Sequence, residues 1–388
     1  MPSAAVQCHK VCGVRDRACR ESIGSAVILL LLLFLMGCSS LRVRPTVKIG
    51  LVAPFEGRYR YIGYDVIYAA RLAIREANAA GGVQGYSVEL VAYDDGGDPV
   101  MADEQARKLA TDPELIAAVG HFRTDTTVAA LESYAQAGIP LVAPGLLSPL
   151  SLDGTGDSTA SVFLPGPSVE AVAGALLARL SATEGRVALV TTGGPLGAAI
   201  LRTAPDYAVV ITPTVSPHDP DWRGRVLTSG GAEAKAILCD ADPVTAGEVA
   251  LALREYGWSG VLLGGPEMAF PDFAAVAGSA ADGAVFVTPW PYPSDIADHS
   301  AFVTAYQALG PHVPPPGSLA LPTYVTFQKV LTALARDIST HQTPTRAGMA
   351  TVLSEMTWGE SGSDSLYAYR YRYGPSGVSV AVEMEALR

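Results

Sequence analysis

Residues 47–52 read Val-Lys-Ile-Gly-Leu-Val, a short apolar run typical of a buried strand, and an amphipathic stretch follows at 64–80. Within that stretch, apolar side chains recur at the spacing of one helical face. The residues of this face are Val66, Ala70, Ala73, Ile74 and Ala77. The two segments together predict a strand followed by a helix, which is the repeating unit of a parallel α/β sheet.

The same alternation continues along the chain and then restarts. Further strands are predicted at 87–93, 115–119 and 140–143, with helices near 99–111 and 124–137. A second series has strands at 186–190 and near 207–212, 234–239, 260–263 and 283–287. Helices near 298–309, 322–338 and 344–356 follow, and strands at 366–373 and 378–384 come last. We therefore predict an α/β protein with two doubly wound parallel-sheet lobes and a ligand cleft at the carboxyl ends of the strands.

Glycine and proline mark the joints between these elements. Pro165-Gly166-Pro167 separates the two series, and the Pro-Trp-Pro-Tyr-Pro run at 289–293 closes the second. Gly81-Gly82 suits a left-handed helix end, and Asp98-Pro99 suits a helix start with Asp98 as N-cap. The chain is thus expected to cross between its lobes more than once.

The N-terminal segment predicts export. Four basic residues, Lys10, Arg15, Arg17 and Arg20, precede an uncharged run at 23–36, which is short for a bilayer about 30 Å thick. The run ends in Leu-Met-Gly-Cys at 35–38, which resembles the lipobox of bacterial lipoproteins. We expect residues 1–37 to be a signal peptide and Cys38 to carry a lipid that anchors the protein to the membrane on its extracytoplasmic side. The alternative is an ordinary signal peptide or anchor that happens to end in Cys.

Composition argues against several classes of protein. Of 388 residues, 49% are hydrophobic and 17% are charged, so the chain is globular, and its length suits two domains. The net charge of -11 disfavours a nucleic-acid partner. The six histidines are scattered, Cys239 is left alone in the predicted mature chain, and no nucleophile elbow, zinc-protease or phosphate-loop motif occurs. We therefore expect no enzyme activity, cofactor, metal or internal disulfide.

An ordered set of motifs from 78 to 267 resembles the leucine/isoleucine/valine-binding protein family, the type I periplasmic binding proteins of branched-chain amino acid ABC importers. The motifs are Asn-Ala-Ala-Gly-Gly-Val-Gln-Gly at 78–85, Tyr-Asp-Asp at 93–95, Asp98-Pro99, Gly120-His121, Gly-Ile-Pro-Leu-Val-Ala-Pro at 138–144 and Gly-Pro-Glu at 265–267. The resemblance implies a hinged fold with three crossovers. Its lobes would be 46–165 with 289–362 and 166–288 with 363–388.

The resemblance also implies site residues. Thr124 would contact a ligand carboxylate, for which a hydroxyl beside a helix N-terminus is suited, although it could be a plain N-cap. Glu267 would pair with a ligand ammonium, although it could be a solvated turn residue. The loop with Gly145, Leu147 and Ser148 would supply a backbone donor and a hydroxyl, with Ser148 acting only if the loop shifts by one residue.

Several positions depart from the family pattern. Where the family often has pocket aromatics, this chain has Ile62, Leu196, Ala241 and Leu319, with Asp242 and Tyr324 as possible substitutes, so the aromatic cage looks lost. Gly97 and Arg123 replace two cysteines that often form a disulfide. The Arg-Tyr-Arg-Tyr run at 58–61, which ends in Tyr61, borders the expected cleft, and its arginines could bind a second carboxylate.

We thus predict an extracytoplasmic solute-binding lipoprotein. We expect its ligand to be a small polar molecule, an amino acid of the branched-chain type or a relative, and its partner to be an ABC permease. The alternative is a sensor of an amide, a dicarboxylate or another small acid that acts on a separate signalling partner.

Overall fold

The computed structural model describes residues 44–145, 161–180, 186–204, 209–211, 221–228, 233–358 and 365–387. The predicted signal segment, Cys38, Leu147 and Ser148 lie outside these ranges. No helix in the described ranges is both long enough and apolar enough to cross a membrane.

The first sheet is parallel throughout and starts with the strand that opens the sequence pattern. Its strands are β1 (Thr46–Ala53), β2 (Ser87–Asp94), β3 (Leu115–Gly120), β4 (Leu141–Val142) and β5 (Val162–Phe163), in the order β2-β1-β3-β4-β5. All six residues of β3 are buried, as expected for a strand with helices on both faces.

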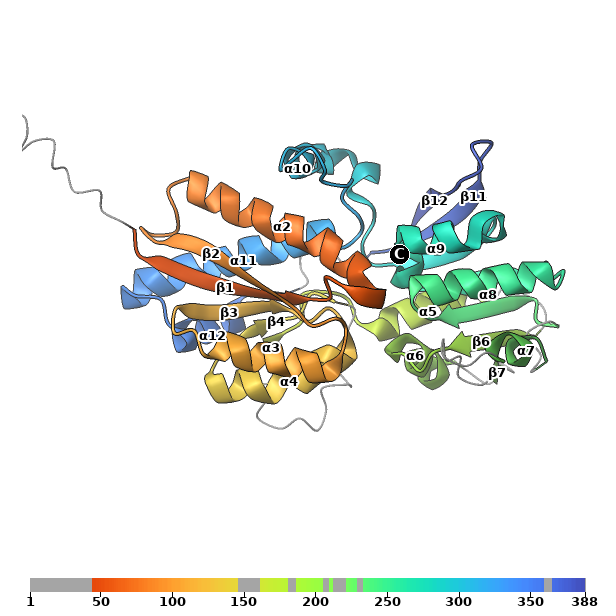
Figure 1. The fold of residues 1–388 in the computed structure, drawn as a ribbon, viewed down its shortest axis with the longest axis horizontal. Helices are drawn as coiled ribbons and strands as arrows, with labels where there is room; N and C mark the ends of the chain where they lie inside the picture. Colours follow the sequence, from red (N-terminus) through yellow and green to blue (C-terminus); the bar gives the residue numbers. More distant parts are fainter. Residues whose placement is uncertain are drawn as a thin grey trace, which may run out of the picture. The chain divides into compact units, whose positions relative to one another are not determined.

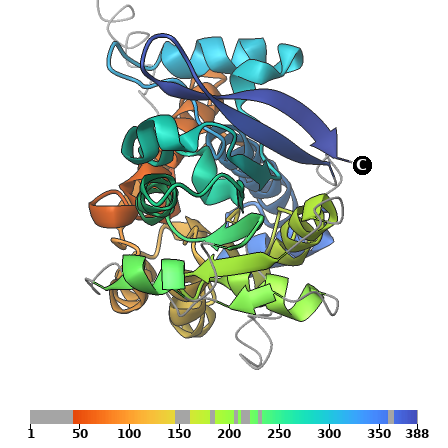
Figure 2. The same cartoon turned by 90° about the vertical axis from the view of Figure 1, so that its right-hand side faces the viewer.

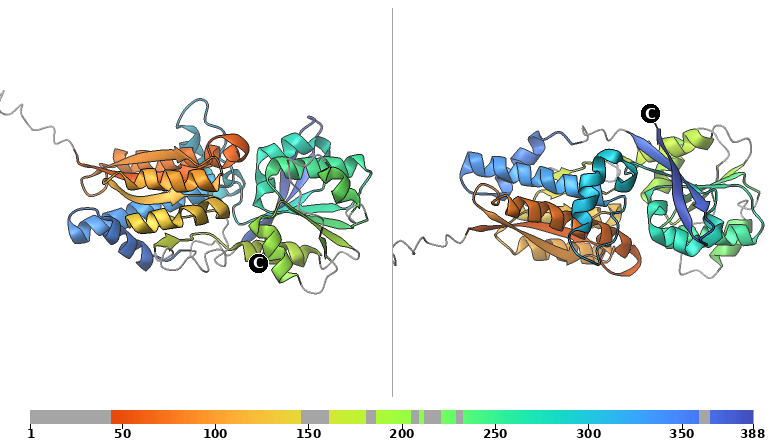
Figure 3. Two further views of the ribbon diagram at one scale, coloured as in Figure 1. Left: turned by 60° about the horizontal axis from the view of Figure 1, so that its bottom comes forward. Right: turned by 90° about the horizontal axis from the view of Figure 1, so that it is seen from above.

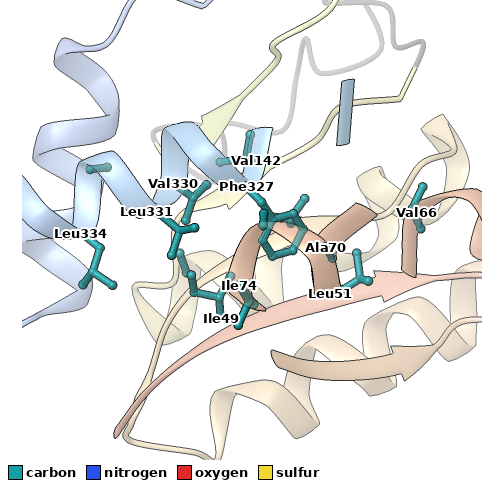
Figure 4. Close-up of a cluster of buried hydrophobic side chains, with 14 of the residues drawn as sticks. Ile49, Leu51, Val66, Ala70, Ile74, Val142, Phe327, Val330, Leu331 and Leu334 are labelled. Atoms are coloured by element: carbon teal, nitrogen blue, oxygen red, sulfur yellow. The ribbon is translucent and has the colours of Figure 1, made fainter. Parts of the chain in front are cut away.

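Helices cover both faces of this sheet (Figure 1). The helices α2 (Arg60–Ala79), α11 (Ala320–His341) and α12 (Arg346–Glu355) share one apolar cluster with the sheet, in which Ile49 and Leu51 of β1 face Phe327 and Val330 of α11 (Figure 4). The helices α3 (Pro99–Ala110) and α4 (Thr124–Ala137) pack together on the other face (Figure 3).

Local sequence signals explain where these helices begin and end. The carboxylate of Asp98 accepts hydrogen bonds from the backbone N–H groups of Val100 and Met101, so the predicted N-cap of α3 is confirmed. Gly81 and Gly82 have φ values of 108° and 80°, and the Gly82 N–H reaches back to the carbonyl of Ala77. The start of α2 was predicted too late, because a short turn at Gly57–Tyr59 already leads into the helix at Arg60.

The second sheet has the order β12-β11-β10-β9-β8-β6-β7. Its parallel part consists of β6 (Val187–Thr191), β7 (Val209–Ile211), β8 (Ala236–Asp240), β9 (Val261–Gly264) and β10 (Val285–Thr288). The last two strands, β11 (Leu366–Tyr373) and β12 (Ser379–Leu387), form a long antiparallel hairpin that ends near the C-terminus (Figure 2). A short turn cannot return a strand in parallel, so β11 and β12 are antiparallel, and β11 also pairs antiparallel with β10.

Helices also cover both faces of the second sheet. The helices α5 (Val169–Leu180) and α6 (Pro195–Thr203) pack on one face. The helices α7 (Trp222–Val226), α8 (Pro243–Glu255) and α9 (Pro271–Ala277) pack on the other. The two doubly wound sheets confirm the predicted fold class.

The chain passes between the sheets after β5 and after β10, and again between α12 and β11. The first two passages contain the proline-rich joints at 165–167 and 289–293. Residues from Thr46 onward form one compact unit, so the exact lobe boundaries stay a prediction.

The helix α10 (Ser300–Gln307) packs beside α2 through Phe302 and Tyr306. Asp65 of α2 accepts backbone N–H bonds from Gly317 and Leu319, which ties α2 to the segment before α11.

Candidate ligand-binding site

A cleft with a volume of about 890 Å³ is lined by segments that follow the carboxyl ends of strands in both sheets. From the first sheet come residues after β1, β3 and β4, and from the second come residues after β6, β8, β9 and β10. Parallel strands point their carboxyl ends the same way, so loops that are distant in sequence meet at one place. Thr124, Glu267, Gly145, Ile62 and Tyr61 all line this cleft, as expected for site residues.

Thr124 is the first residue of α4, and its hydroxyl is unused. Its Oγ1 atom is buried and has no hydrogen-bond partner in the described part of the chain. The N-cap position is Arg123, so the alternative interpretation of Thr124 as a plain N-cap is wrong. Of the first N–H groups of α4, that of Thr126 bonds Asp125 Oδ1 and that of Thr127 bonds the carbonyl of Arg123. The N–H groups of Thr124 and Asp125 have no intrahelical partner and can donate to an anion beside the Thr124 hydroxyl.

Glu267 follows β9 in the short helical turn Pro266–Ala269. The side chain keeps part of its surface toward the cleft, but the surrounding protein excludes bulk water. This burial, reinforced by the negative charge of Asp240, raises the pKa of Glu267 to about 7. A ligand cation would favour the charged form of this carboxylate and would itself gain a partner in a site with little water.

Asp240, the last residue of β8, is a cleft residue that the sequence analysis did not identify. Only 7% of it is exposed, and it accepts a 2.8 Å hydrogen bond from Thr191 Oγ1 and backbone bonds from Gly194 and Gly197. A Cβ atom at Gly194 would lie 2.7 Å from this carboxylate, so only glycine allows the backbone to come so close. Burial raises the pKa of Asp240. Asp240 directly follows the strand predicted near 234–239, and this place at the end of an apolar run was the signal that could have found it.

The arginines of the 58–61 run already have acidic partners. Arg58 forms a 2.9 Å ion pair with Asp242 and also hydrogen-bonds Thr245 Oγ1. Arg60 forms a 3.1 Å ion pair with Asp272. These pairs join the turn before α2 and the first residue of α2 to the N-terminal ends of α8 and α9. Both guanidinium groups therefore have an anionic partner, while the buried Arg58 Nε has no hydrogen-bond partner among the described residues.

Arg123 and Gly97, which replace the expected cysteine pair, both lie against the ring of Tyr59. The guanidinium of Arg123 lies 3.7 Å from the ring centroid and makes two hydrogen bonds, of 2.7 and 3.1 Å, to Asp125. A Cβ atom at Gly97 would come within 2.3 Å of the ring. A stacked aromatic ring therefore occupies the space between the two positions.

The walls of the cleft correct the expectation of a lost aromatic cage. Five aromatic side chains line it, namely Tyr59, Tyr61, Phe122, Phe270 and Trp290. The rings of Tyr61 and Phe270 lie 4.3 Å apart. These aromatics come from positions other than those compared in the sequence, so the substitutions move the aromatic surface and do not remove it.

Only some of the positions that hold aromatic residues in the family line the cleft in this protein. Ile62, Ala241, Leu319 and the proposed substitute Asp242 line the cleft. Leu196 is only 2% exposed and belongs to the apolar cluster under α6, while its neighbour Pro195 faces the cleft. Tyr324 lies elsewhere and hydrogen-bonds Glu76 and Gln328.

Gly145 lines the cleft after β4, where it lies against the chain that follows β3. A Cβ atom there would stand 2.3 Å from the carbonyl oxygen of Phe122, which explains why the position is glycine. Within the described ranges, no group of three or more His, Cys, Asp or Glu side chains is placed to hold a metal ion.

Comparison with protein families gives a match over most of the chain. A family model described as periplasmic binding protein matches residues 46–373. An amino acid binding protein of Pseudomonas aeruginosa is 37% identical over 103 residues, which are 26% of this chain and 28% of that protein. Leu/Ile/Val-binding protein homolog 3 of Brucella melitensis is 23% identical over 352 residues, 87% of this chain and 94% of that protein.

Solved structures share the fold. The branched-chain amino acid transporter substrate binding protein LivJ from Streptococcus pneumoniae, in complex with isoleucine, has a TM-score of 0.75 and 21% identity, over 88% of this chain and 99% of its own. A solute binding protein of an ABC transporter from Rhodopseudomonas palustris, in complex with 3,4-dihydroxy benzoic acid, has a TM-score of 0.72 and 18% identity, over 88% and 97%. The resemblance predicted from the sequence motifs is thereby confirmed.

Proposed function

The chain belongs to the periplasmic binding protein family, and we propose that it captures an amino acid outside the cytoplasm and delivers it to the permease of an ABC importer. Related proteins with this fold are described as binding either an aliphatic amino acid or a benzoate. The choice between these ligand classes has to come from the residues of the cleft.

The observation that carries the proposal is that Thr124 and Glu267 both line the same cleft. Thr124 offers an unused buried hydroxyl at a helix N-terminus, which suits a carboxylate. Glu267 offers a carboxylate without a cationic partner in the described part of the chain, which suits an ammonium. An α-amino acid carries both charges, whereas a benzoate would leave Glu267 without a partner.

We also propose a lipid anchor at Cys38, so that the protein stays at the membrane near its permease. The basic segment, the short apolar run and the Leu-Met-Gly-Cys sequence at 35–38 support this anchor. Labelling of growing cells with a tagged fatty acid tests it, since Cys38→Ser should remove the label from the protein.

Thermal melting of the purified full-length protein against amino acids, small amides, dicarboxylates and aromatic acids tests the ligand class. A ligand at 100 times its dissociation constant should add about 2.7 kcal/mol to the free energy of unfolding. We expect an amino acid to raise the melting temperature and Glu267→Ala to remove that shift. A shift with aromatic acids alone would keep the fold assignment and refute the amino-acid ligand.

A further inference from the structure

The charges that line the cleft are unbalanced. Each of its two guanidinium groups already has a carboxylate, Arg58 with Asp242 and Arg123 with Asp125. Two further carboxylates, Asp240 and Glu267, also line the cleft. In the part of the chain that the structure describes, neither of these two has a lysine, arginine or histidine within ion-pair distance.

Asp240 and Glu267 lie at the carboxyl ends of two neighbouring strands of the second sheet. Their strands, β8 and β9, are parallel neighbours, and Cys239 pairs with Gly264 at the carboxyl ends. Asp240 follows Cys239 as the last residue of β8, and Glu267 lies in the helical turn Pro266–Ala269 that follows the end of β9 at Gly264. Burial raises the pKa of Glu267, and the negative charge of Asp240 raises it further, so the two carboxylates lie close enough for one to disfavour the charge of the other.

A zwitterionic ligand such as leucine would neutralise only one of these groups. Its ammonium would meet Glu267 and its carboxylate would meet the donors at Thr124. Asp240 would then keep only the longer-range attraction of Arg123, which already pairs with Asp125. Thr191 and two backbone N–H groups hold Asp240 in place, but all of them are neutral donors. A second cationic group on the ligand would remove the remaining imbalance.

The apolar walls also suit a cation. Tyr61, Phe270 and Trp290 line the same cleft, and aromatic faces attract ammonium and guanidinium groups. The cleft volume of about 890 Å³ leaves room for a longer side chain than that of leucine. The buried Thr124 hydroxyl, which has no partner among the described residues, independently indicates an anionic group at the other end of the ligand.

We propose that the cleft selects a basic amino acid, with Glu267 binding the α-ammonium, Asp240 binding the cationic end of the side chain, and the Thr124 corner binding the α-carboxylate. This inference rests on the proposed function, because it assigns the ligand class of the same site. Asp240 is then the residue that sets the specificity.

Isothermal titration of the full-length protein with matched ligand pairs tests the inference without any variant. Citrulline has the shape of arginine without its charge, and norleucine similarly replaces lysine. We expect arginine or lysine to bind at least about tenfold more tightly than its neutral analogue, because one charged hydrogen bond contributes roughly 1.5–3 kcal/mol. Equal affinities within both pairs would overturn the inference and leave the amino-acid function intact.

A variant pair then locates the effect. Asp240→Asn should lose about tenfold or more in affinity for the basic amino acid and change little for its neutral analogue. Asp298→Asn, an exposed change of the same charge outside the cleft, is the matched control and should leave both affinities unchanged. Loss of affinity for both ligands of a pair in a normally melting Asp240→Asn protein would overturn the specificity role.

Two other outcomes separate this inference from the proposed function. If agmatine, which lacks the carboxylate, binds as tightly as arginine, the cationic-end contact stands and the amino-acid ligand is wrong. If only aromatic acids bind, both are wrong.

Discussion

Glu267 is the residue whose ionisation the proposed ligand controls. Burial and the charges of Asp240 and Asp242 raise its pKa to about 7, and Arg123 lowers it in part. A bound ammonium favours the ionised form, so binding releases a proton whenever the empty site is protonated. At pH 6 about one empty site in ten is ionised, so the dissociation constant should be about tenfold larger than at pH 8.

Glu267→Gln should flatten this pH dependence, because glutamine keeps the shape and does not titrate. Titration calorimetry from pH 5.5 to 8.5 provides the measurement. An unchanged pH slope in Glu267→Gln would show that another group controls binding.

The stability of the empty protein should follow the same group with a definite sign. The pKa of Glu267 in the folded chain lies above its ordinary value of 4.5, so the folded state binds more protons between these values. The stability that this group contributes is therefore full below about pH 4.5 and is lost as the pH rises through about 7. Burial also raises the pKa of Asp65 to about 7, so this group changes the stability with the same sign. The free energy of unfolding, measured by urea denaturation at several pH values, should therefore depend less on pH in Glu267→Gln but should still depend on it.

Some of the site residues could be predicted from the sequence, and others could not. Glu267 ends the Gly-Pro-Glu motif, and Thr124 follows the Gly120-His121 motif by three residues, so their place in the cleft could be predicted. Asp240 carries no motif, because its role depends on the adjacent ends of β8 and β9, which only the strand order reveals. The partners of Arg58 and Arg60 were missed because Asp242 and Asp272 are far away in sequence.

At the scale of elements, two helical glycines should respond oppositely to alanine. Gly174 of α5 has open space where a Cβ would stand, so Gly174→Ala should raise the free energy of unfolding by about 0.5–1 kcal/mol. Gly247 of α8 has no such space, because its Cβ would lie 2.8 Å from Cβ of Val276 in α9. Gly247→Ala should therefore lower the free energy of unfolding by about 1–3 kcal/mol.

Chemical denaturation of both variants provides the comparison, and each serves as the control for the other. A stabilised Gly247→Ala protein would contradict the close packing of α8 on α9.

The alternation of strand and helix could be predicted because each apolar run and amphipathic stretch is local. The approach of α8 to α9 could not, because it depends on residues 29 positions apart.

At the scale of the whole molecule, two ion pairs join the turn before α2 and the first residue of α2 to the helices of the second sheet. The pair between Arg58 and Asp242 is the more buried one, since the Asp242 side chain is only 5% exposed. The pair between Arg60 and Asp272 lies nearer the surface, with 43% of the Arg60 side chain exposed. Removing a cation from a buried pair costs more than removing one from an exposed pair.

Arg58→Ala should therefore open the empty protein more than Arg60→Ala does. Small-angle X-ray scattering should show a larger radius of gyration for Arg58→Ala without ligand and a return toward the wild-type value with ligand. Identical scattering from wild type and both variants would show that these pairs do not hold the cleft closed.

Titration calorimetry of the bound amino acid against its N-acetyl derivative tests the central claim most directly, since acetylation removes the ammonium and leaves the carboxylate. We predict measurable binding of the free amino acid to the wild-type protein, no detectable binding of the N-acetyl form, and a loss of roughly tenfold or more in Glu267→Gln. Equal binding of both forms would contradict the role of Glu267 and the amino-acid ligand with it.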